Sequence, residues 1–164
     1  SRRGYVTGLP VGGRGLVAAP AQPAMISEAE TQRLVAAAQR ARAAAYAPYS
    51  GFRVGAALLC EDDAGADAIV VGCNVENASY PAGICAERAA VAAAVTRGFR
   101  RFRAIAIATE AASATSPCGI CRQVLAEFAP ELIVVSAPKD GDTVHWSLAT
   151  LLPFAFLPDS LPRD

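Results

Sequence analysis

The sequence predicts an α/β fold, a three-layer α/β/α sandwich around a mixed five-stranded sheet. Three observations predict it. The length of 164 residues suits one domain with a sizeable core. An acidic, glycine-containing turn at 61–67 joins two β-rich runs into a hairpin. After the hairpin, helical and strand patterns alternate, which is typical of a sheet covered by helices on both faces.

The first helix has a clear start signal. Ser27-Glu28-Ala29-Glu30 fits a capping box, with Ser27 as the N-cap and Glu30 at the third helical position. An alanine-rich helix is expected from there to about Ala45, with Leu34, Val35 and Ala38 as its apolar face. The loop at 46–51 follows, because its proline and glycine break the helical pattern.

The later elements follow from apolar runs and turn residues. The predicted strands are the β-rich runs 52–60, 68–74, 102–109, 132–136 and 143–146. The predicted helices are 85–96, which Gly98 ends, 118–128, and the short segment 148–152. The loops between them are expected at 77–84, 111–117 and 138–142, and a tail follows at 153–164.

Residues 1–24 differ from the rest of the chain. They carry three arginines and no acidic residue, and the only methionine, Met25, comes just after them. An appended, poorly ordered leader is the favoured interpretation, with an organelle-targeting leader as the alternative. The domain is therefore expected to span 25–164.

Composition excludes several classes of protein. The chain has 15 basic and 15 acidic residues, and this zero net charge argues against a nucleic-acid partner, which normally requires a basic surface. No apolar run reaches the length of a membrane span, so no membrane partner is expected. Five cysteines, three of them at ligand spacing, indicate a reducing, cytoplasmic compartment and a metal rather than disulfides.

The stretch from Cys85 to Gln123 carries the chemistry. Cys85, Cys118 and Cys121 offer three thiolates, which suit one zinc ion per chain. Three protein ligands leave a fourth position for water, whose pKa falls to about 7 in favourable sites. Glu87 lies two residues after the first thiolate, where it can handle that water's proton without binding the metal. The layout matches the zinc deaminase signature, with Cys85 where many members carry histidine.

Other interpretations of these cysteines stay open at this point. Cys118 and Cys121 alone could form a redox pair, although that leaves Glu87 unexplained. A structural zinc site needs a fourth ligand from Cys60, Cys73 or His145, and none of these stands at paired ligand spacing. Because Cys60 and Cys73 lie in apolar runs, they are expected in the core.

Both ligand clusters begin helices, where the helix dipole favours thiolates. Three thiolates on Zn²⁺ leave a net negative site, and Arg88 is the candidate cation that offsets this charge. A surface arginine is the equally weighted alternative. Arg122 and Gln123 are expected to serve structural hydrogen bonding.

Two pairs with i, i+2 spacing are candidates for substrate contacts. Asn74 and Glu76 place an amide and a carboxylate on one side of an extended segment, where they can bind vicinal hydroxyls. On spacing alone, a solvated strand end is favoured for them. Phe52 and Val54 offer an apolar wall for a flat ring, and core packing explains them equally well.

From about Glu28 to Phe156 the chain closely resembles the small, homotetrameric cytidine deaminases. The matching stretches, in chain order, are Tyr46–Leu58, Gly72–Ala78, Cys85–Arg88, Pro117–Gln123 and Leu151–Pro153. Several motifs in one order are far more specific than the zinc signature alone. Residues 1–24 lie outside the resemblance.

The resemblance implies zinc-dependent deamination of cytidine and deoxycytidine in pyrimidine salvage, with Glu87 as the general acid and base. It implies that Asn74 and Glu76 bind the ribose, that Phe52 packs against the base, and that Arg88 contacts the thiolates. It also implies a homotetramer in which Phe156 reaches a neighbour's active site. Phe154 stands where many members have a small residue, so either phenylalanine could contact the base. The backbone N–H of Ala86 and the carbonyl near Ser116 are candidates for orienting the base.

Three other functions remain as alternatives: a nucleic-acid cytosine deaminase, a deaminase of another small aminopyrimidine, and a zinc-binding module without activity. Neutral charge counts against the first of these. The second would differ at the ribose-binding pair, and the third predicts a filled fourth ligand position.

Overall fold

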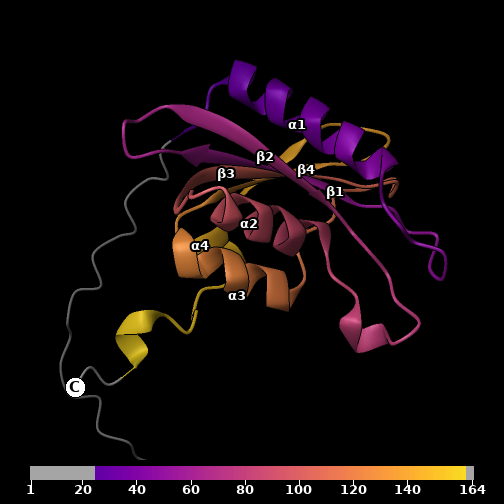
Figure 1. Ribbon diagram of the computed structural model, residues 1–164. Coiled ribbons are helices and arrows are strands. Elements are labelled where there is room, and N and C mark those ends of the chain that lie inside the picture. Colours follow the sequence, from indigo (N-terminus) through magenta and orange to yellow (C-terminus); the bar gives the residue numbers. More distant parts are fainter. Residues whose placement is uncertain (1–24, 162–164) are drawn as a thin grey trace, which may run out of the picture.

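A single mixed sheet of five strands, in the order β2-β1-β3-β4-β5, forms the middle of the computed structural model, which describes residues 25–161 (Figure 1). The strands are β1 (Gly55–Glu61), β2 (Asp67–Cys73), β3 (Arg101–Ala108), β4 (Ile133–Ala137) and β5 (Val144–Ser147). Only the central pair β3–β4 is parallel, and the other three pairs are antiparallel. The predicted mixed five-stranded sheet is confirmed.

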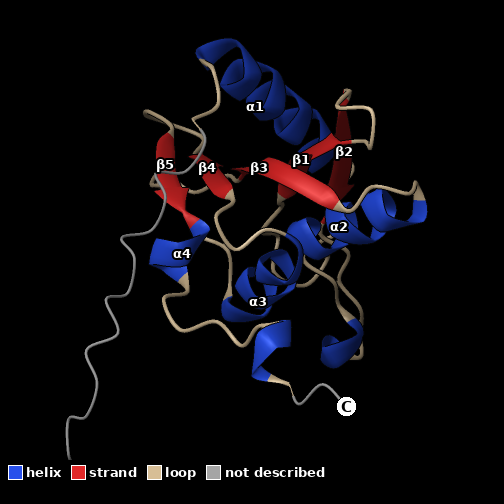
Figure 2. Cartoon of the chain, turned by 90° about the vertical axis from the view of Figure 1, so that its left-hand side faces the viewer, coloured by secondary structure: helices blue, strands red, loops and turns tan. Residues whose placement is uncertain are grey.

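Helices cover both faces of this sheet, as expected for three layers. The helices are α1 (Glu28–Ala43), α2 (Ala86–Thr96), α3 (Gly119–Phe128) and the short α4 (Leu148–Leu151), with 3₁₀ turns at Tyr80–Ala82 and Pro158–Ser160. Figure 2 shows α1 alone on one side of the sheet and α2, α3 and α4 on the other. The capping box of α1 is present with both of its hydrogen bonds.

The largest boundary difference lies at 52–54, which the sequence places in the first strand. The structure begins β1 at Gly55. The side chain of Asn74 accepts a hydrogen bond from the Val54 N–H and donates one to the Phe52 carbonyl. The Asn74 N–H also donates to the Val54 carbonyl at 3.1 Å, so a single residue, Asn74, holds this short segment ahead of β1. The leader prediction for 1–24 falls outside the described residues.

Alternating side chains of β1 divide the core between the two helix layers. Ala56, Leu58 and Cys60 belong to the cluster packed under α2 and α3. Ala57 and Leu59 belong to the cluster packed under α1. This is the period of two that a strand buried on both faces requires.

Two glycines let helices approach the sheet closely. A Cβ at Gly55 would lie 2.1 Å from the carbonyl oxygen of Ala38 in α1. A Cβ at Gly72 would lie 2.4 Å from the backbone nitrogen of Ala90 in α2. Neither position has room for a side chain, so each glycine fixes how near its helix lies to the sheet.

The aromatic residues near the C-terminus differ in their exposure. Trp146 on β5 is half-buried and packs against the core cluster under α2 and α3. Phe154 and Phe156 remain 96% and 59% exposed.

Within residues 25–161, no helix has both the length and the apolar character that spanning a bilayer demands.

Candidate active site

One end of the sheet collects the candidate residues. Because β1 runs antiparallel to both of its neighbours, Gly55 at its start pairs with Cys73 at the end of β2 and with Ala108 at the end of β3. Val54, Asn74 and Thr109, which flank these three residues in sequence, therefore emerge together. The N-termini of α2 and α3, with Cys85 and Cys118 as their N-caps, supply the remaining wall.

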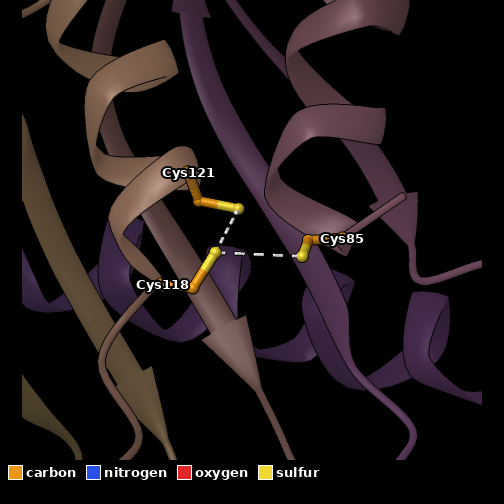
Figure 3. A group of neighbouring side chains, drawn as sticks. All are labelled: Cys85, Cys118 and Cys121. Carbon is orange, nitrogen blue, oxygen red and sulfur yellow. Dashed lines mark hydrogen bonds between the residues drawn. The ribbon is translucent and has the colours of Figure 1, made fainter. Parts of the chain in front are cut away.

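The three predicted ligand cysteines form one cluster. Their sulfurs all lie within 4.8 Å of one another. The Cys85 and Cys118 sulfurs are 4.0 Å apart, and the Cys118 and Cys121 sulfurs are 3.5 Å apart (Figure 3). A tetrahedral zinc about 2.3 Å from each thiolate separates the sulfurs by about 3.8 Å. The donor set therefore fits a zinc ion in both chemistry and spacing.

The alternative fourth ligands lie elsewhere. In the described part of the chain, no further cysteine, histidine or carboxylate joins the three-sulfur group. Cys60 is fully buried in the core and Cys73 is half-buried on β2. His145 is exposed on β5, at the far edge of the sheet. The cluster thus has the three protein donors typical of a catalytic zinc rather than the four of a structural one.

Contacts within the cluster shift the pKa values of two of the thiols in opposite directions. Hydrogen bonding from Cys121, reinforced by Arg88 and Cys118, lowers the pKa of the Cys85 thiol to about 5, although burial opposes the shift. The same contact with Cys85, together with burial, raises the pKa of Cys121. The thiolate therefore forms first on Cys85, and a bound dication favours thiolates at all three positions.

Arg88 lies against this cluster. Its Nη2 is 3.9 Å from the Cys85 sulfur and donates a hydrogen bond to the Gly83 carbonyl at 3.2 Å. Its Nε is buried and has no hydrogen-bond partner among the described residues. The Cys85 thiolate, as the main cause, raises the pKa of Arg88. The arginine thus places its charge beside the sulfurs, where it can offset part of their negative charge.

Glu87 faces the same space and is 5% exposed. Burial raises its pKa, and the nearby Cys85 charge adds to the shift. It lines a cleft of about 520 Å³, a size suited to a small organic ligand. The cleft is walled by residues from the same end of the sheet, including Phe52, Val54, Asn74, Glu76, Cys85, Ala86, Glu87, Arg88, Thr109, Thr115, Ser116 and Cys118.

Asn74 and Glu76 both line the cleft, and their side chains also hold its rim, the segment 49–54. The Glu76 carboxylate accepts hydrogen bonds from the backbone N–H groups of Tyr49 and Ser50, at 2.8 and 3.2 Å, and from the Ser50 hydroxyl. These bonds, with the Ser50 hydroxyl first, lower the pKa of Glu76. Asn74 holds the segment 52–54 in the same way. The i, i+2 spacing predicted their shared side but not these partners.

The aromatic candidates separate into two groups. Phe52 is 41% exposed and lines the cleft with Val54, as one of the two interpretations expected. Phe156 does not belong to the wall of this chain's own cleft within the described residues. Neither does Phe154, which borders a groove beside α4 instead.

Several residues that shape the cleft belong to none of the motifs found in the sequence. Ser136, fully buried on β4, donates its hydroxyl to the Thr115 carbonyl and accepts from the Thr115 N–H. Thr109 and Thr115 line the cleft themselves. The one available signal was Ser136, a lone polar residue at the end of a buried apolar run.

Comparisons with known proteins agree on one kind of protein. A family model described as the cytidine and deoxycytidylate deaminase zinc-binding region matches residues 28–137. A cytidine deaminase of Sporosarcina psychrophila is 44% identical over 133 residues, covering 80% of this chain and 95% of that relative. A cytidine deaminase of Mycobacterium tuberculosis H37Rv is 43% identical over 127 residues, covering 77% and 90%. The crystal structure of a cytidine deaminase from Burkholderia pseudomallei matches with a TM-score of 0.72 and 45% identity, covering 80% of this chain and 100% of that one.

Proposed function

The chain belongs to the zinc-dependent cytidine deaminase family, and we propose that it hydrolyses free cytidine and deoxycytidine to uridine and deoxyuridine with release of ammonia. The observation that carries this proposal is the three-cysteine cluster with a buried carboxyl, Glu87, beside it in one cleft. One zinc ion per subunit is the cofactor that this cluster suits.

Zinc, when bound at Cys85, Cys118 and Cys121, supplies an acidified water as the nucleophile. Glu87 performs the proton transfers. Its carboxylate takes a proton from the water that adds to C4 of the ring and delivers a proton to N3. It then takes the proton of the new C4 hydroxyl and passes it to the amino group, which leaves as ammonia while the C4 carbonyl forms. The raised pKa of Glu87 suits a group that must both accept and return a proton.

The remaining wall residues bind and orient the nucleoside. Asn74 and Glu76 offer an amide and a carboxylate to the ribose hydroxyls. Phe52 and Val54 form an apolar surface for the pyrimidine. The backbone N–H of Ala86 and the carbonyl near Ser116 orient the base. All six residues line the cleft, which supports these roles.

The C-terminal segment is assigned to assembly. Phe154 and Phe156 are two exposed phenylalanines in one short segment, and exposed apolar groups of this kind mark interfaces. We propose a homotetramer in which Phe156 reaches the base in a neighbour's cleft. Phe156 does not line the cleft of its own chain, so it can contact a bound base only in the cleft of a neighbouring subunit.

The proposed substrate and the free thiols together indicate the compartment and the pathway in which the enzyme acts. All five cysteines are free thiols, which supports a reducing compartment, the cytoplasm. Hydrolysis of free cytidine and deoxycytidine belongs to pyrimidine salvage. The neutral net charge supports free nucleosides rather than nucleic acid as the substrate.

One experiment tests the activity. The purified, zinc-loaded chain is incubated in turn with cytidine, deoxycytidine, cytosine and single-stranded DNA, and loss of the cytosine absorbance is followed together with ammonia release. We expect turnover of both nucleosides and little of the other two. Turnover of DNA alone, or of no substrate at all, contradicts the proposal.

A second experiment tests the shared active site. Glu87→Gln and Phe156→Ala subunits, each of low activity alone, are dissociated, mixed and reassembled. A mixed assembly contains sites with an intact Glu87 and a neighbour's intact Phe156, so part of the activity returns. A monomer by light scattering, or no recovery despite proven mixing, rules out the shared site.

A further inference from the structure

Arg122, in the first turns of α3, uses all of its guanidinium nitrogens as donors. Its Nε donates to the Pro117 carbonyl at 2.7 Å, and its Nη2 donates to the Ser116 hydroxyl at 2.8 Å. Its Nη1 donates to the Leu151 carbonyl at 2.7 Å. A guanidinium is planar and rigid, so three directional bonds from one group fix their acceptors relative to one another.

The acceptors belong to two separate parts of the molecule. Ser116 lines the cleft, and Pro117 precedes the ligand Cys118. Leu151 is the last residue of α4, where a helix leaves carbonyls without intrahelical partners. Arg122 therefore satisfies a helix-end carbonyl and ties it to the wall of the cleft.

The neighbouring Gln123 continues this connection. Its Nε2 donates to the Phe156 carbonyl at 2.6 Å. Two successive residues of α3 thus bind the two ends of the C-terminal segment. Arg122 binds it at Leu151, where the segment leaves α4, and Gln123 binds it at Phe156. Between them, Leu152 and Ala155 pack on the core, but Phe154 and Phe156 are exposed. The phenylalanine side chains are not what holds the segment 152–156 in place.

We propose that Arg122, assisted by Gln123, is a positioning residue that fixes the segment 152–156 and the Ser116–Pro117 wall to the zinc-binding helix α3. The position of the segment 152–156 relative to the cleft wall is then fixed. Substrate contacts made by either of them depend on Arg122. The kinetic part of this inference rests on the proposed deaminase function, whereas the structural part does not.

The test compares Arg122→Lys and Gln123→Ala with the wild-type, zinc-loaded protein. Lysine keeps the charge but loses the planar fork. Arg33→Lys, on the exposed side of α1, is the matched control. Amide hydrogen exchange of 152–157 measures the structural part, and KM and kcat for cytidine measure the functional part.

For Arg122→Lys we expect exchange of 152–157 to rise about 10-fold, the size expected for the loss of hydrogen bonds made by a charged donor. We expect KM to rise by about the same factor while kcat stays within about threefold, because Glu87 lies on α2, whereas Arg122 donates to the Ser116–Pro117 wall and to Leu151. Zinc content stays at one per chain. Gln123→Ala shows the same pattern more weakly, and Arg33→Lys shows neither change.

Unchanged exchange in 152–157 overturns the inference. Faster exchange with an unchanged KM also overturns it, because the contacts then serve structure alone. If Arg122→Lys does not fold, Gln123→Ala decides the question by the same two readouts. Absence of turnover in the wild-type protein refutes the proposed function instead, and exchange of 152–157 then decides whether Arg122 fixes the segment.

Discussion

The close contact at Gly72 allows a sharp test of how the placement of helix α2 affects activity. In Gly72→Ala the new Cβ would lie 2.4 Å from the backbone nitrogen of Ala90 and 2.6 Å from the carbonyl oxygen of Ala86, and ordinary contact begins near 3.4 Å. Helix α2 must therefore move away from β2 by about 1 Å, because backbone cannot rotate aside as a long side chain can. Overpacking of this kind costs about 1–3 kcal/mol of unfolding free energy.

The loss of catalytic activity in Gly72→Ala should be larger than its loss of unfolding free energy suggests. Helix α2 carries Cys85 as its N-cap and Glu87 in its first turn. A displacement of about 1 Å at reacting groups can cost roughly 10²-fold in rate. We therefore expect kcat/KM for cytidine to fall by about that factor in Gly72→Ala, measured on zinc-loaded, folded protein.

Gly55→Ala is the matched control. Its Cβ would lie 2.1 Å from the Ala38 carbonyl, so it overpacks the sheet at least as severely, but it displaces α1, which bears none of the zinc ligands. We expect a similar loss of stability by urea unfolding with a much smaller loss of kcat/KM. Equal losses of activity in the two variants, or wild-type activity in Gly72→Ala, would show that placement of α2 does not control catalysis.

Three further predictions follow from the site and from α1. Glu87→Gln should keep one zinc per chain and the fold but lose at least about 10²-fold in kcat, the lower range for a lost acid–base group, and near-normal turnover would exclude that role. Glu76→Ala should impair cytidine turnover far more than turnover of a base lacking ribose hydroxyls. Ser50→Ala removes the hydroxyl that donates to the Glu76 carboxylate and accepts from the Phe52 N–H, and it should affect the two substrates alike. An equal loss of both in Glu76→Ala would make Glu76 structural. Glu30→Ala should lower the unfolding free energy by about 1 kcal/mol at pH 7. Because bonds from Ser27 lower the Glu30 pKa below its ordinary 4.5, this contribution is present at neutral pH and lost as the pH falls through the folded pKa, so urea unfolding at pH 3 should show a smaller difference.

The sequence predicts best those features that depend on neighbouring residues. The capping box at Ser27 and Glu30 forms as expected, because all of its partners lie within one helical turn. Gly98, with φ +93°, ends the region of α2 as predicted, since a left-handed conformation suits glycine. Cys85 and Cys118 stand at the starts of α2 and α3, where the pattern predicted helices to begin, and Cys121 follows in the first turn of α3.

Features that depend on distant segments were not predictable in this way. The strand expected at 52–54 is absent because Asn74, about twenty positions away, takes its hydrogen bonds. The spacing of Asn74 and Glu76 carries no information about Ser50, whose hydroxyl contacts the carboxylate. The expected structural bonding of Arg122 gave no hint that its acceptors would be Ser116 and Leu151.

The cleft gathers at one end of the sheet, and the opposite end carries exposed turns that suit attachment of a tag. The turn between β1 and β2 lies there, and Asp63, Ala64 and Gly65 in it are exposed. The turn after α2, with Gly98, lies at the same end, because α2 begins at the cleft and runs away from it. A peptide tag or a surface linker inserted at 63–65 would therefore be attached about a strand's length from the cleft of its own subunit.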